Sequence, residues 1–354
     1  MKVEKRINAF VKLGEFLSQF QPEKIIKNDT VLWNDLFFEP FLMQIKRGIE
    51  FNGWFTEENI LYAFNSWSNI LNVNNINKWI STYHLDKVKP KNIGIIMAGN
   101  IPLVGFHDFL SVLISGNNAI VKQSSSDKHY LPLIAKYLEK IEPEFKGKIT
   151  FTDEKLSNFD AVIATGSNNT ARYFDYYFGK YPNIIRQNRN SVAIITGKET
   201  KEELQKLGED IFRYFGLGCR SVSKLYVPND YDFDLFFNAI YAYKDLINYT
   251  KYQNNYDYNK AVYLMSQFKL IENGFLMLKE DVNYSSPIAT LFYEHYTDIE
   301  SLKQKLEIEK ESIQCIVGDQ NIENIVPFGE TQKPQLWDYA DGVDTLQFLQ
   351  DFNQ

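Results

Sequence analysis

Cysteine is scarce in this sequence, with Cys219 and Cys315 as its two members among 354 residues. So few cysteines exclude a disulfide framework and are typical of a protein from the reducing cytosol. The opening stretch MKVEKRINAFVKLGEFLSQF lacks the apolar core of a secretory signal. No stretch approaches the ~18 consecutive apolar residues of a membrane span. We therefore expect a cytoplasmic protein without a membrane span.

An excess of positive charge is also missing, because the net charge is −7 at pH 7. Nucleic acid and acidic membrane surfaces attract proteins with a net positive charge, so we expect neither as a partner. The GxGxxG fingerprint of many dinucleotide-binding folds is absent, as are internal repeats and low-complexity tracts. The histidines are scattered without the spacing of metal ligands, so we expect no metal site; they are His84, His107, His129 and His295.

What is present is a helical region followed by an alternation of short apolar runs and helical patterns. Residues 1–88 carry apolar side chains at helical spacing. Strands are predicted at 92–100, 118–125, 148–152, 159–167 and 191–197, and helices at 103–117, 128–141 and 168–179. Gly116-Asn117 is a typical signal for the end of the first of these helices. The alternation predicts an α/β fold, with parallel sheets and helices on their faces.

The segment before Cys219 reads as a capped helix. Thr200 and Glu203 have the spacing of a capping box, and the helix is predicted to run to Gly216. Its apolar face is formed by Leu204, Leu207, Ile211 and Phe215.

Cys219 follows this helix on the glycine-rich turn GLGC, at the entry to a strand at 223–228. Such a turn exposes a side chain and leaves backbone N–H groups near it, which are the needs of a nucleophile that generates an oxyanion. A small hydrophobic core residue is the alternative reading. Cys315 lies within an apolar strand, SIQCIVGD, where that alternative is much stronger.

Three polar positions at predicted strand ends are candidates for ligand binding. Asn100 ends the first strand, Lys122 closes the second, and Gly166-Ser167 joins a strand to a helix. Ligands of open parallel sheets bind at the carboxyl ends of strands, and a helix amino terminus attracts phosphate. The alternatives are a turn or cap at Asn100, a surface lysine at Lys122 and an ordinary turn at Gly166-Ser167.

Taken in order, these pieces resemble the aldehyde dehydrogenase superfamily over about residues 90–330. The matching motifs are Asn100-Ile101-Pro102, Gly116-Asn117 with Lys122, Thr165-Gly166-Ser167, Cys219, and Pro327-Phe328-Gly329. The segments GLGCRSVSKLYVP and PFGETQKPQLWDYADGVDTLQFL are similar to those of the acyl-CoA reductase of the bacterial bioluminescence fatty acid reductase type. That family makes aldehydes from long-chain fatty acyl thioesters with NADPH.

The resemblance implies a role for each matching residue. Cys219 is the nucleophile that accepts the acyl group, and Asn100 and the Cys219 backbone N–H stabilise the oxyanion. Lys122, Gly166 and Ser167 hold the nucleotide. Ser125 stands where NAD-preferring members of the superfamily often have a glutamate that binds the ribose 2′-hydroxyl. We expect NADPH as the cofactor, since serine tolerates a 2′-phosphate that a carboxylate repels.

The sequence also departs from the aldehyde-oxidising branch. Arg186 stands where that branch has the glutamate that activates water. Loss of that glutamate favours thioester reduction over acid formation. The guanidinium also favours an anion beside it, such as a nucleotide phosphate. Asn283 stands loosely where that branch has a glutamate for the nucleotide ribose. His107-Asp108 invites a reading as a catalytic base, although packing or helix capping explains it more simply.

We therefore expect an acyl-CoA reductase with an aldehyde-dehydrogenase-like fold. Its predicted parts are a helical region (1–88), a nucleotide-binding domain (89–215), a catalytic cysteine domain (216–330) and a tail that packs back (331–354). The acyl donor is either fatty acyl-CoA or an acyl group on a protein, with an acyl-transferring partner in the second case, and we expect a homo-oligomer. The rival readings are an aldehyde-oxidising dehydrogenase and a non-catalytic protein that binds acyl groups or nucleotide.

Overall fold

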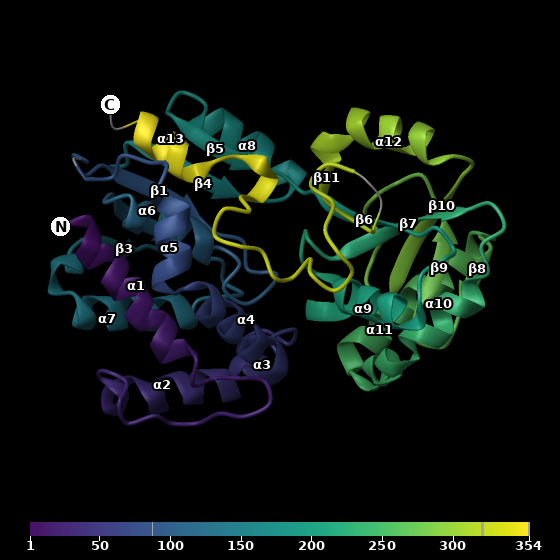
Figure 1. The fold of residues 1–354 in the computed structure, drawn as a ribbon, viewed down its shortest axis with the longest axis horizontal. Helices are drawn as coiled ribbons and strands as arrows, with labels where there is room; N and C mark the ends of the chain where they lie inside the picture. Colours follow the sequence, from purple (N-terminus) through teal and green to yellow (C-terminus); the bar gives the residue numbers. More distant parts are fainter. Residues whose placement is uncertain (87, 320–321, 353–354) are drawn as a thin grey trace. The chain divides into compact units, whose positions relative to one another are not determined.

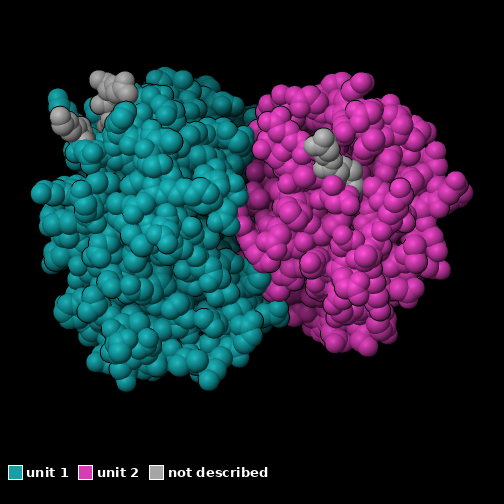
Figure 2. Space-filling model, in the orientation of Figure 1, with its two compact units in different colours: residues 1–187, 335–354 teal, residues 188–334 magenta. Residues whose placement is uncertain are grey.

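The chain folds into two compact units, each built around its own β-sheet. The computed structural model describes residues 1–86, 88–319 and 322–352. Unit 1 comprises residues 1–187 and 335–354, and unit 2 comprises residues 188–334 (Figure 2). The predicted α/β class, with two largely parallel sheets and a helical amino-terminal region, is confirmed.

The sheet of unit 1 has the strand order β3-β2-β1-β4-β5, and the neighbouring strands are parallel (Figure 1). Its strands are β1 (Asn92–Ile96), β2 (Asn118–Lys122), β3 (Ile149–Phe151), β4 (Ala161–Thr165) and β5 (Asn183–Arg186). The order runs outward from β1 in one direction and from β4 in the other. The loops after β1 and β4 therefore flank a topological switch point, where open parallel sheets bind ligands.

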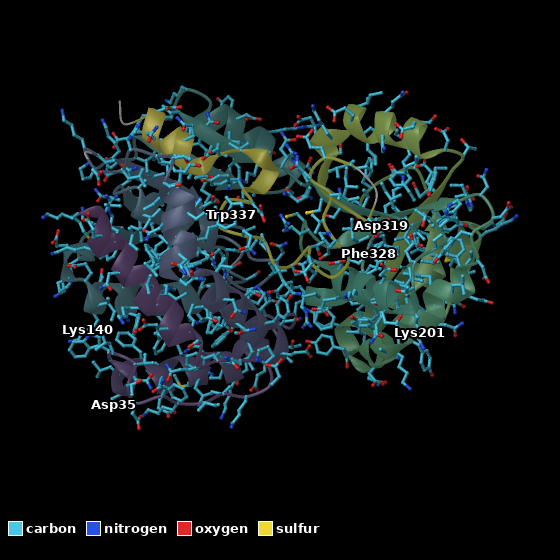
Figure 3. The ribbon with its side chains drawn as sticks, viewed as in Figure 1. Asp35, Lys140, Lys201, Asp319, Phe328 and Trp337 are labelled. Carbon is cyan, nitrogen blue, oxygen red and sulfur yellow. The ribbon has the colours of Figure 1, made fainter. Side chains whose placement is uncertain are left out.

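Helices cover this sheet and continue into the amino-terminal region. They are α1 (Val3–Leu17), α2 (Asn34–Lys46), α3 (Gly48–Phe51), α4 (Glu57–Ile70), α5 (Val73–Ile80), α6 (Phe106–Ile114), α7 (Tyr130–Ile141), α8 (Asn168–Phe178) and α13 (Thr345–Asp351). Because α1 packs against α4, α5, α6 and α7, the amino-terminal helices share one core with the sheet. The carboxy-terminal segment joins the same core through Trp337 and through the contact of α13 with α6 (Figure 3).

The sheet of unit 2 has the order β11-β6-β7-β10-β9-β8, in which β8 is antiparallel to β9 and the other described pairs are parallel. Its strands are β6 (Asn190–Ile194), β7 (Val222–Pro228), β8 (Leu270–Glu272), β9 (Met277–Glu280), β10 (Thr290–Tyr296) and β11 (Ile313–Val317). Its helices are α9 (Lys201–Phe212), α10 (Phe233–Ile240), α11 (Thr250–Met265) and α12 (Ile299–Ile308). The buried side chains of α9 and α10 form the core on one face, and those of α12 form a second core.

The unit boundaries differ from the domain limits drawn from the sequence. Strand β6 pairs with β7 and β11, so residues 188–215 belong with the cysteine-bearing sheet rather than with the predicted nucleotide-binding domain. The amino-terminal helices and the segment 335–354 belong to unit 1. The apolar periodicity located the strands from β1 to β7 other than β5, but it did not reveal which strands pair, because pairing partners lie far apart in the sequence. The functions given to the predicted domains stay predictions.

None of the described helices has both the length and the apolar character that a membrane-spanning helix requires.

Two predicted helix ends are present as hydrogen-bonded caps. After α6, Asn117 N–H donates to the Val112 carbonyl and Gly116 N–H donates to the Leu113 carbonyl, which is the Schellman pattern, with Gly116 at a φ of +95°. Thr200 and Glu203 form the predicted capping box of α9. The predicted end of α9 was wrong, because the regular helix stops at Phe212 and is followed by a short 3₁₀ segment, Arg213–Gly216.

Gly116 lies where α1 meets the end of α6, and this contact gives a stability prediction. Arg6 is buried and donates to the carbonyls of Ile114 (2.6 Å) and Leu85 (2.7 Å). A Cβ on Gly116 would lie 2.5 Å from Arg6 Nη1. Gly116→Ala should lower the free energy of unfolding by about 2 kcal/mol or more, from the left-handed backbone and the overpacked guanidinium together.

Gly147→Ala is the matched control for this substitution. Gly147 also has a positive φ, +76°, but a Cβ there would meet no described atom within 4 Å. Urea unfolding should show a loss of only about 1 kcal/mol for this variant. Equal losses for the two variants would contradict the role of Arg6.

Candidate active site

Cys219 lies in unit 2 on the turn between the 3₁₀ segment and β7. Its side chain is exposed, whereas Cys315 on β11 is 5% exposed, and both are thiols rather than partners in a disulfide. The two residues therefore differ in the property that matters first for a nucleophile, which is access to a reactant. A buried Cys315 fits the small hydrophobic residue that its sequence context favoured.

The backbone that leads into this turn is strained. Tyr214 and Phe215 have φ values of +56° and +57°, and Gly216 follows at +74°. Bulky residues rarely adopt the left-handed conformation, which costs roughly 1–2 kcal/mol per residue. Both aromatic side chains are buried, and the Phe215 ring stacks on Tyr249 with 4.8 Å between centroids. Ring packing thus helps to hold a backbone that these residues do not favour by themselves.

Hydrogen bonds hold the other side of the turn. Ser221 N–H donates to the Gly218 carbonyl (3.0 Å), and Ser191 Oγ on β6 donates to the Cys219 carbonyl (2.9 Å). Arg220 Nε donates to the Thr331 carbonyl at 2.5 Å. These contacts place the thiol-bearing residue between β6, β7 and the segment around Thr331.

The Pro327-Phe328-Gly329 motif, which the sequence singled out far from Cys219, belongs to the same unit. Phe328 is 7% exposed and packs in the core formed by α9 and α10 (Figure 3). The residues that follow it, as far as Gln332, approach the turn of Cys219 through Thr331. The structure therefore brings together two motifs that are separated by about a third of the chain.

The other predicted site residues, apart from Asn283, lie in unit 1, at the carboxyl edge of its sheet. Lys122 is the last residue of β2, and its Nζ donates to the Glu154 carbonyl at 3.0 Å. Ser125 is exposed in the turn that follows. Asn100 is also exposed, but β1 ends at Ile96, so Asn100 lies in the loop beyond the strand rather than at its end.

Gly166 and Ser167 join β4 to α8 at the same edge. Ser167 is the N-cap of α8, and its Oγ accepts from Thr170 N–H at 3.3 Å. Gly166 N–H donates to the Arg186 carbonyl at 3.3 Å. A Cβ on Gly166 would lie 2.9 Å from Phe174, so glycine allows the helix to start close to the strand. In this structure the pair makes a closely packed strand-to-helix turn.

Arg186 was expected to lie beside an anion, for which a nucleotide phosphate was the example, and the anion that the structure places there is the Asp108 carboxylate. The Arg186 guanidinium is buried in an ion pair with Asp108 on α6 and also donates to Thr345 Oγ1 at 3.0 Å. Arg186 therefore connects β5, α6 and α13 inside unit 1. His107 is half-buried beside the Leu336 carbonyl, with 2.9 Å between Nε2 and the oxygen, and its removal from water lowers its pKa. Packing accounts for His107-Asp108, as the simpler reading held.

Asn283, the loosely placed candidate for the ribose, makes local contacts in unit 2. Its backbone N–H and its Nδ2 both donate to Asp281 Oδ1, at 2.9 and 2.8 Å. Among the described residues there is no group of three or more histidine, cysteine or acidic side chains arranged to hold a metal ion.

Two buried carboxylates next to these residues were missed in the sequence. Asp210 lies on α9 between Leu207 and Ile211, and an acidic residue within that apolar face was the available signal. Asp127 lies beyond β2, where nothing in the local sequence pattern distinguished it from a surface residue. Asp127 Oδ2 accepts from Leu103 N–H at 2.8 Å, and Leu103 has a φ of +58°. Asp127 therefore holds the strained loop that carries Asn100.

The environment of Asp127 makes stability depend on pH. Burial raises the pKa of its carboxyl from 3.8 to about 7, against the opposing hydrogen bond from Leu103. Its Oδ1 has no hydrogen-bond partner within the described part of the chain. Between pH 3.8 and about 7, the Asp127 carboxyl is therefore protonated in the folded protein and ionised in the unfolded chain. The contribution of Asp127 to stability accordingly falls as pH rises through that window.

Asp127→Asn should therefore become more stable relative to the native protein as pH rises from 5 to 7, with little further change from pH 7 to 8. The amide still accepts from Leu103 but carries no charge, and the difference grows by at most about 1.4 kcal/mol per pH unit. Urea unfolding across pH 5–8 measures it. Asp153→Asn is the control, because Asp153 is exposed and its pKa is lowered by Lys128, so it stays ionised throughout that range. A difference that is constant with pH would refute the assignment.

Comparison with known proteins places this chain in a family. The family model for acyl-CoA reductase (LuxC) matches residues 70–272, more than half of the chain. The long-chain acyl-protein thioester reductase of Aliivibrio fischeri is 25% identical over 215 residues, covering 55% of this chain and 44% of that protein. The Vibrio harveyi protein of the same name is 21% identical over 230 residues, covering 56% and 48%. The chain thus spans about half the length of the curated relatives it matches.

Solved structures show the same fold at low sequence identity. Aldehyde dehydrogenase 21 from Physcomitrella patens matches with a TM-score of 0.68 and 12% identity, covering 100% of this chain and 85% of that one. Indole-3-acetaldehyde dehydrogenase from P. syringae matches with a TM-score of 0.63 and 13% identity, covering 92% and 74%. The chain belongs to the acyl-CoA reductase (LuxC) family and has the aldehyde dehydrogenase fold.

Proposed function

We propose that this chain reduces a long-chain fatty acyl thioester to the aldehyde through an acyl group held on Cys219. The observation that carries the proposal is the contrast between the exposed thiol of Cys219, on its strained and hydrogen-bonded turn, and the buried thiol of Cys315. The names of the curated relatives, long-chain acyl-protein thioester reductases, support the substrate class.

The chemistry follows from the nucleophile. The Cys219 thiolate attacks the thioester carbonyl, a carbon–sulfur bond forms, and the negative charge moves to the carbonyl oxygen. We assign stabilisation of that oxyanion to Asn100 and to the Cys219 backbone N–H, since both are hydrogen-bond donors and both match the family's motifs. When the oxyanion collapses, the donor thiolate leaves and takes up a proton, and the acyl group stays on Cys219. Transfer of a hydride to this acyl group and loss of the Cys219 thiolate then give the aldehyde.

A nicotinamide dinucleotide, when bound, supplies the hydride. The residues at the carboxyl edge of the unit 1 sheet fit such a ligand, because they combine an ammonium group, exposed hydroxyls and a helix amino terminus at a switch point. Lys122, Ser125, Gly166 and Ser167 are the residues that we assign to it. The solved P. syringae structure with the same fold was determined with NAD+. We propose NADPH for this chain because of Ser125.

The acyl donor is either a CoA thioester or an acyl group on a partner protein. Both donors present the same carbonyl and lose a thiolate, so a long-chain acyl-CoA is a suitable probe for the chemistry that they share. The names of the relatives favour the protein-bound donor.

Cys219→Ala should abolish acylation by a long-chain acyl-CoA and the NADPH-dependent release of aldehyde. Intact-mass spectrometry in a single turnover without NADPH should show one acyl group on the native chain, which disappears when NADPH is added. Cys315→Ala is the matched control and should acylate at the native rate, because its thiol is buried.

Acylation of Cys219→Ala at the native rate would disprove the assignment of the nucleophile. Rapid release of free fatty acid from the native acyl-enzyme would instead favour the aldehyde-oxidising reading. An unacylated native chain that still binds acyl-CoA would favour a non-catalytic binding protein.

Ser125→Glu should move cofactor preference from NADPH toward NADH. Two like charges about 4 Å apart near a protein surface repel by roughly 1–4 kcal/mol, so the ratio of kcat/KM values should change by about fivefold or more. Steady-state kinetics with both nucleotides measures the ratio, and Ser125→Ala is the control that keeps the site uncharged. Better turnover of the native enzyme with NADH would contradict the choice of NADPH.

A further inference from the structure

We propose that Asp210 is a positioning residue for Cys219, acting through the segment Gly329–Gln332. The proposal rests on the proposed role of Cys219 as the acyl-accepting nucleophile. Asp210 lies on α9, nine residues before Cys219 in the sequence, and its side chain is fully buried.

Within the described part of the chain, the hydrogen bonds to the Asp210 carboxylate come from the Gly329–Gln332 segment. Oδ2 accepts from Gly329 N–H at 2.6 Å, and Oδ1 accepts from Thr331 N–H at 3.0 Å and from Thr331 Oγ1 at 2.8 Å. Two backbone amides and one hydroxyl of an irregular segment are thus satisfied by one side chain. Buried backbone groups outside helices and sheets need such partners, so Asp210 determines where this segment lies.

The same segment holds the two residues that follow Cys219. The Thr331 carbonyl accepts from Arg220 Nε at 2.5 Å, and Gln332 Nε2 lies 3.4 Å from Ser221 Oγ. Asp210 and Arg220 therefore bind opposite ends of Thr331, its N–H and hydroxyl on one side and its carbonyl on the other. Movement of Thr331 would be transmitted directly to the residue adjacent to the nucleophile.

The hydrogen bonds at Asp210 require a carboxylate rather than an amide. The three partners are all donors in the described geometry, so an ionised carboxylate satisfies each of them. An amide in its place would put an NH₂ group against at least one backbone N–H. Burial raises the pKa of Asp210 to about 6, and the hydrogen bonds from Gly329 and Thr331 oppose that rise, so the group is mostly ionised at pH 7.

A positioning role of Asp210 can be recognised by comparing two reactions of Cys219, enzymatic acylation and chemical alkylation. Attack on a thioester needs the sulfur at a defined angle and distance from the carbonyl, and a displacement of about 1 Å can cost about 10²-fold in rate. Alkylation by iodoacetamide needs only an accessible thiolate. A loosened turn should therefore slow enzymatic acylation much more than chemical alkylation.

The test compares Asp210→Asn with Glu202→Gln, which neutralises an exposed carboxylate on the same helix. Three quantities are measured at pH 7: the single-turnover rate of Cys219 acylation by a long-chain acyl-CoA, the rate of Cys219 alkylation by iodoacetamide, and amide hydrogen exchange in residues 216–222. Asp210→Asn should slow acylation by roughly 10–10²-fold, leave alkylation nearly unchanged and speed exchange in the turn. Glu202→Gln should match the native protein in all three.

Thr331→Val is the second variant, for the case that Asp210→Asn does not fold. It keeps the backbone donor, removes the hydroxyl donor and nearly preserves shape, so a smaller loss of acylation rate is expected. Native acylation rates in folded variants at both positions would overturn the proposal. A parallel fall of acylation and alkylation would also overturn it, since it would show loss of the thiolate rather than of its position.

Failure of the proposed function gives a different result. In that case the native chain itself is not acylated at Cys219. The exchange measurement then decides the structural part alone, because unchanged exchange of residues 216–222 in Asp210→Asn would show that Asp210 does not hold the turn.

Discussion

The hydrogen bonds from Gly329 and Thr331 to the buried Asp210 carboxylate are the contacts on which the candidate active site of unit 2 depends. They join α9 to residues 119 and 121 positions further along the chain. The turn of Cys219 follows α9 after the short 3₁₀ segment, and Arg220 reaches the same distant segment. A glycine-rich turn has little structure of its own, so its shape must come from the segments around it.

Unit 1 also uses buried side chains to hold other segments, through hydrogen bonds to backbone groups from Asp127 and Arg6 and through side-chain contacts from Arg186. Asp127 holds the loop of Asn100, Arg6 holds two carbonyls at the ends of other segments, and Arg186 joins Asp108 to the carboxy-terminal helix. Each such group is costly to bury and far more costly to leave without its partner, by about 3–5 kcal/mol for a broken buried pair. These contacts therefore determine where each loop lies more than they add to net stability.

Local patterns predicted the helix caps and most elements from β1 to β7 because their causes are local, but α10, α11, α12, β8, β9 and β10 were not predicted. The Schellman cap at Gly116 and the capping box at Thr200 each depend on residues within one turn of a helix. Strand β5 and the end of α9 were missed, the first because NIIR is a short run and the second because Tyr214 and Phe215 have ordinary helical side-chain spacing. Their left-handed backbone is imposed by tertiary packing, which no spacing pattern records.

In the candidate site, too, local features were predicted from the sequence and tertiary contacts were not. The motifs placed Cys219, Lys122 and Ser167 at the turn, strand end and helix start where the structure has them. An anion beside Arg186 was expected, but Asp108 was not identified as that anion, because a charged residue at a strand end looks the same whether it faces a ligand or a buried aspartate. Asp127 and Asp210 were missed for the converse reason, as their partners are backbone N–H groups, which every sequence contains.

In the Cys219 turn, the free-energy cost of the left-handed backbone is similar in size to the stabilisation from the hydrogen bonds to Asp210. Two bulky left-handed residues cost roughly 2–4 kcal/mol together. Hydrogen bonds to a charged group contribute about 1.5–3 kcal/mol each, less the cost of burying the carboxylate. Because neither side dominates, loss of one contact should relax the turn locally while the core formed by α9 and α10 stays packed. A nucleophile held in this way can lose its alignment without loss of the fold, so its position is a property separate from the stability of unit 2.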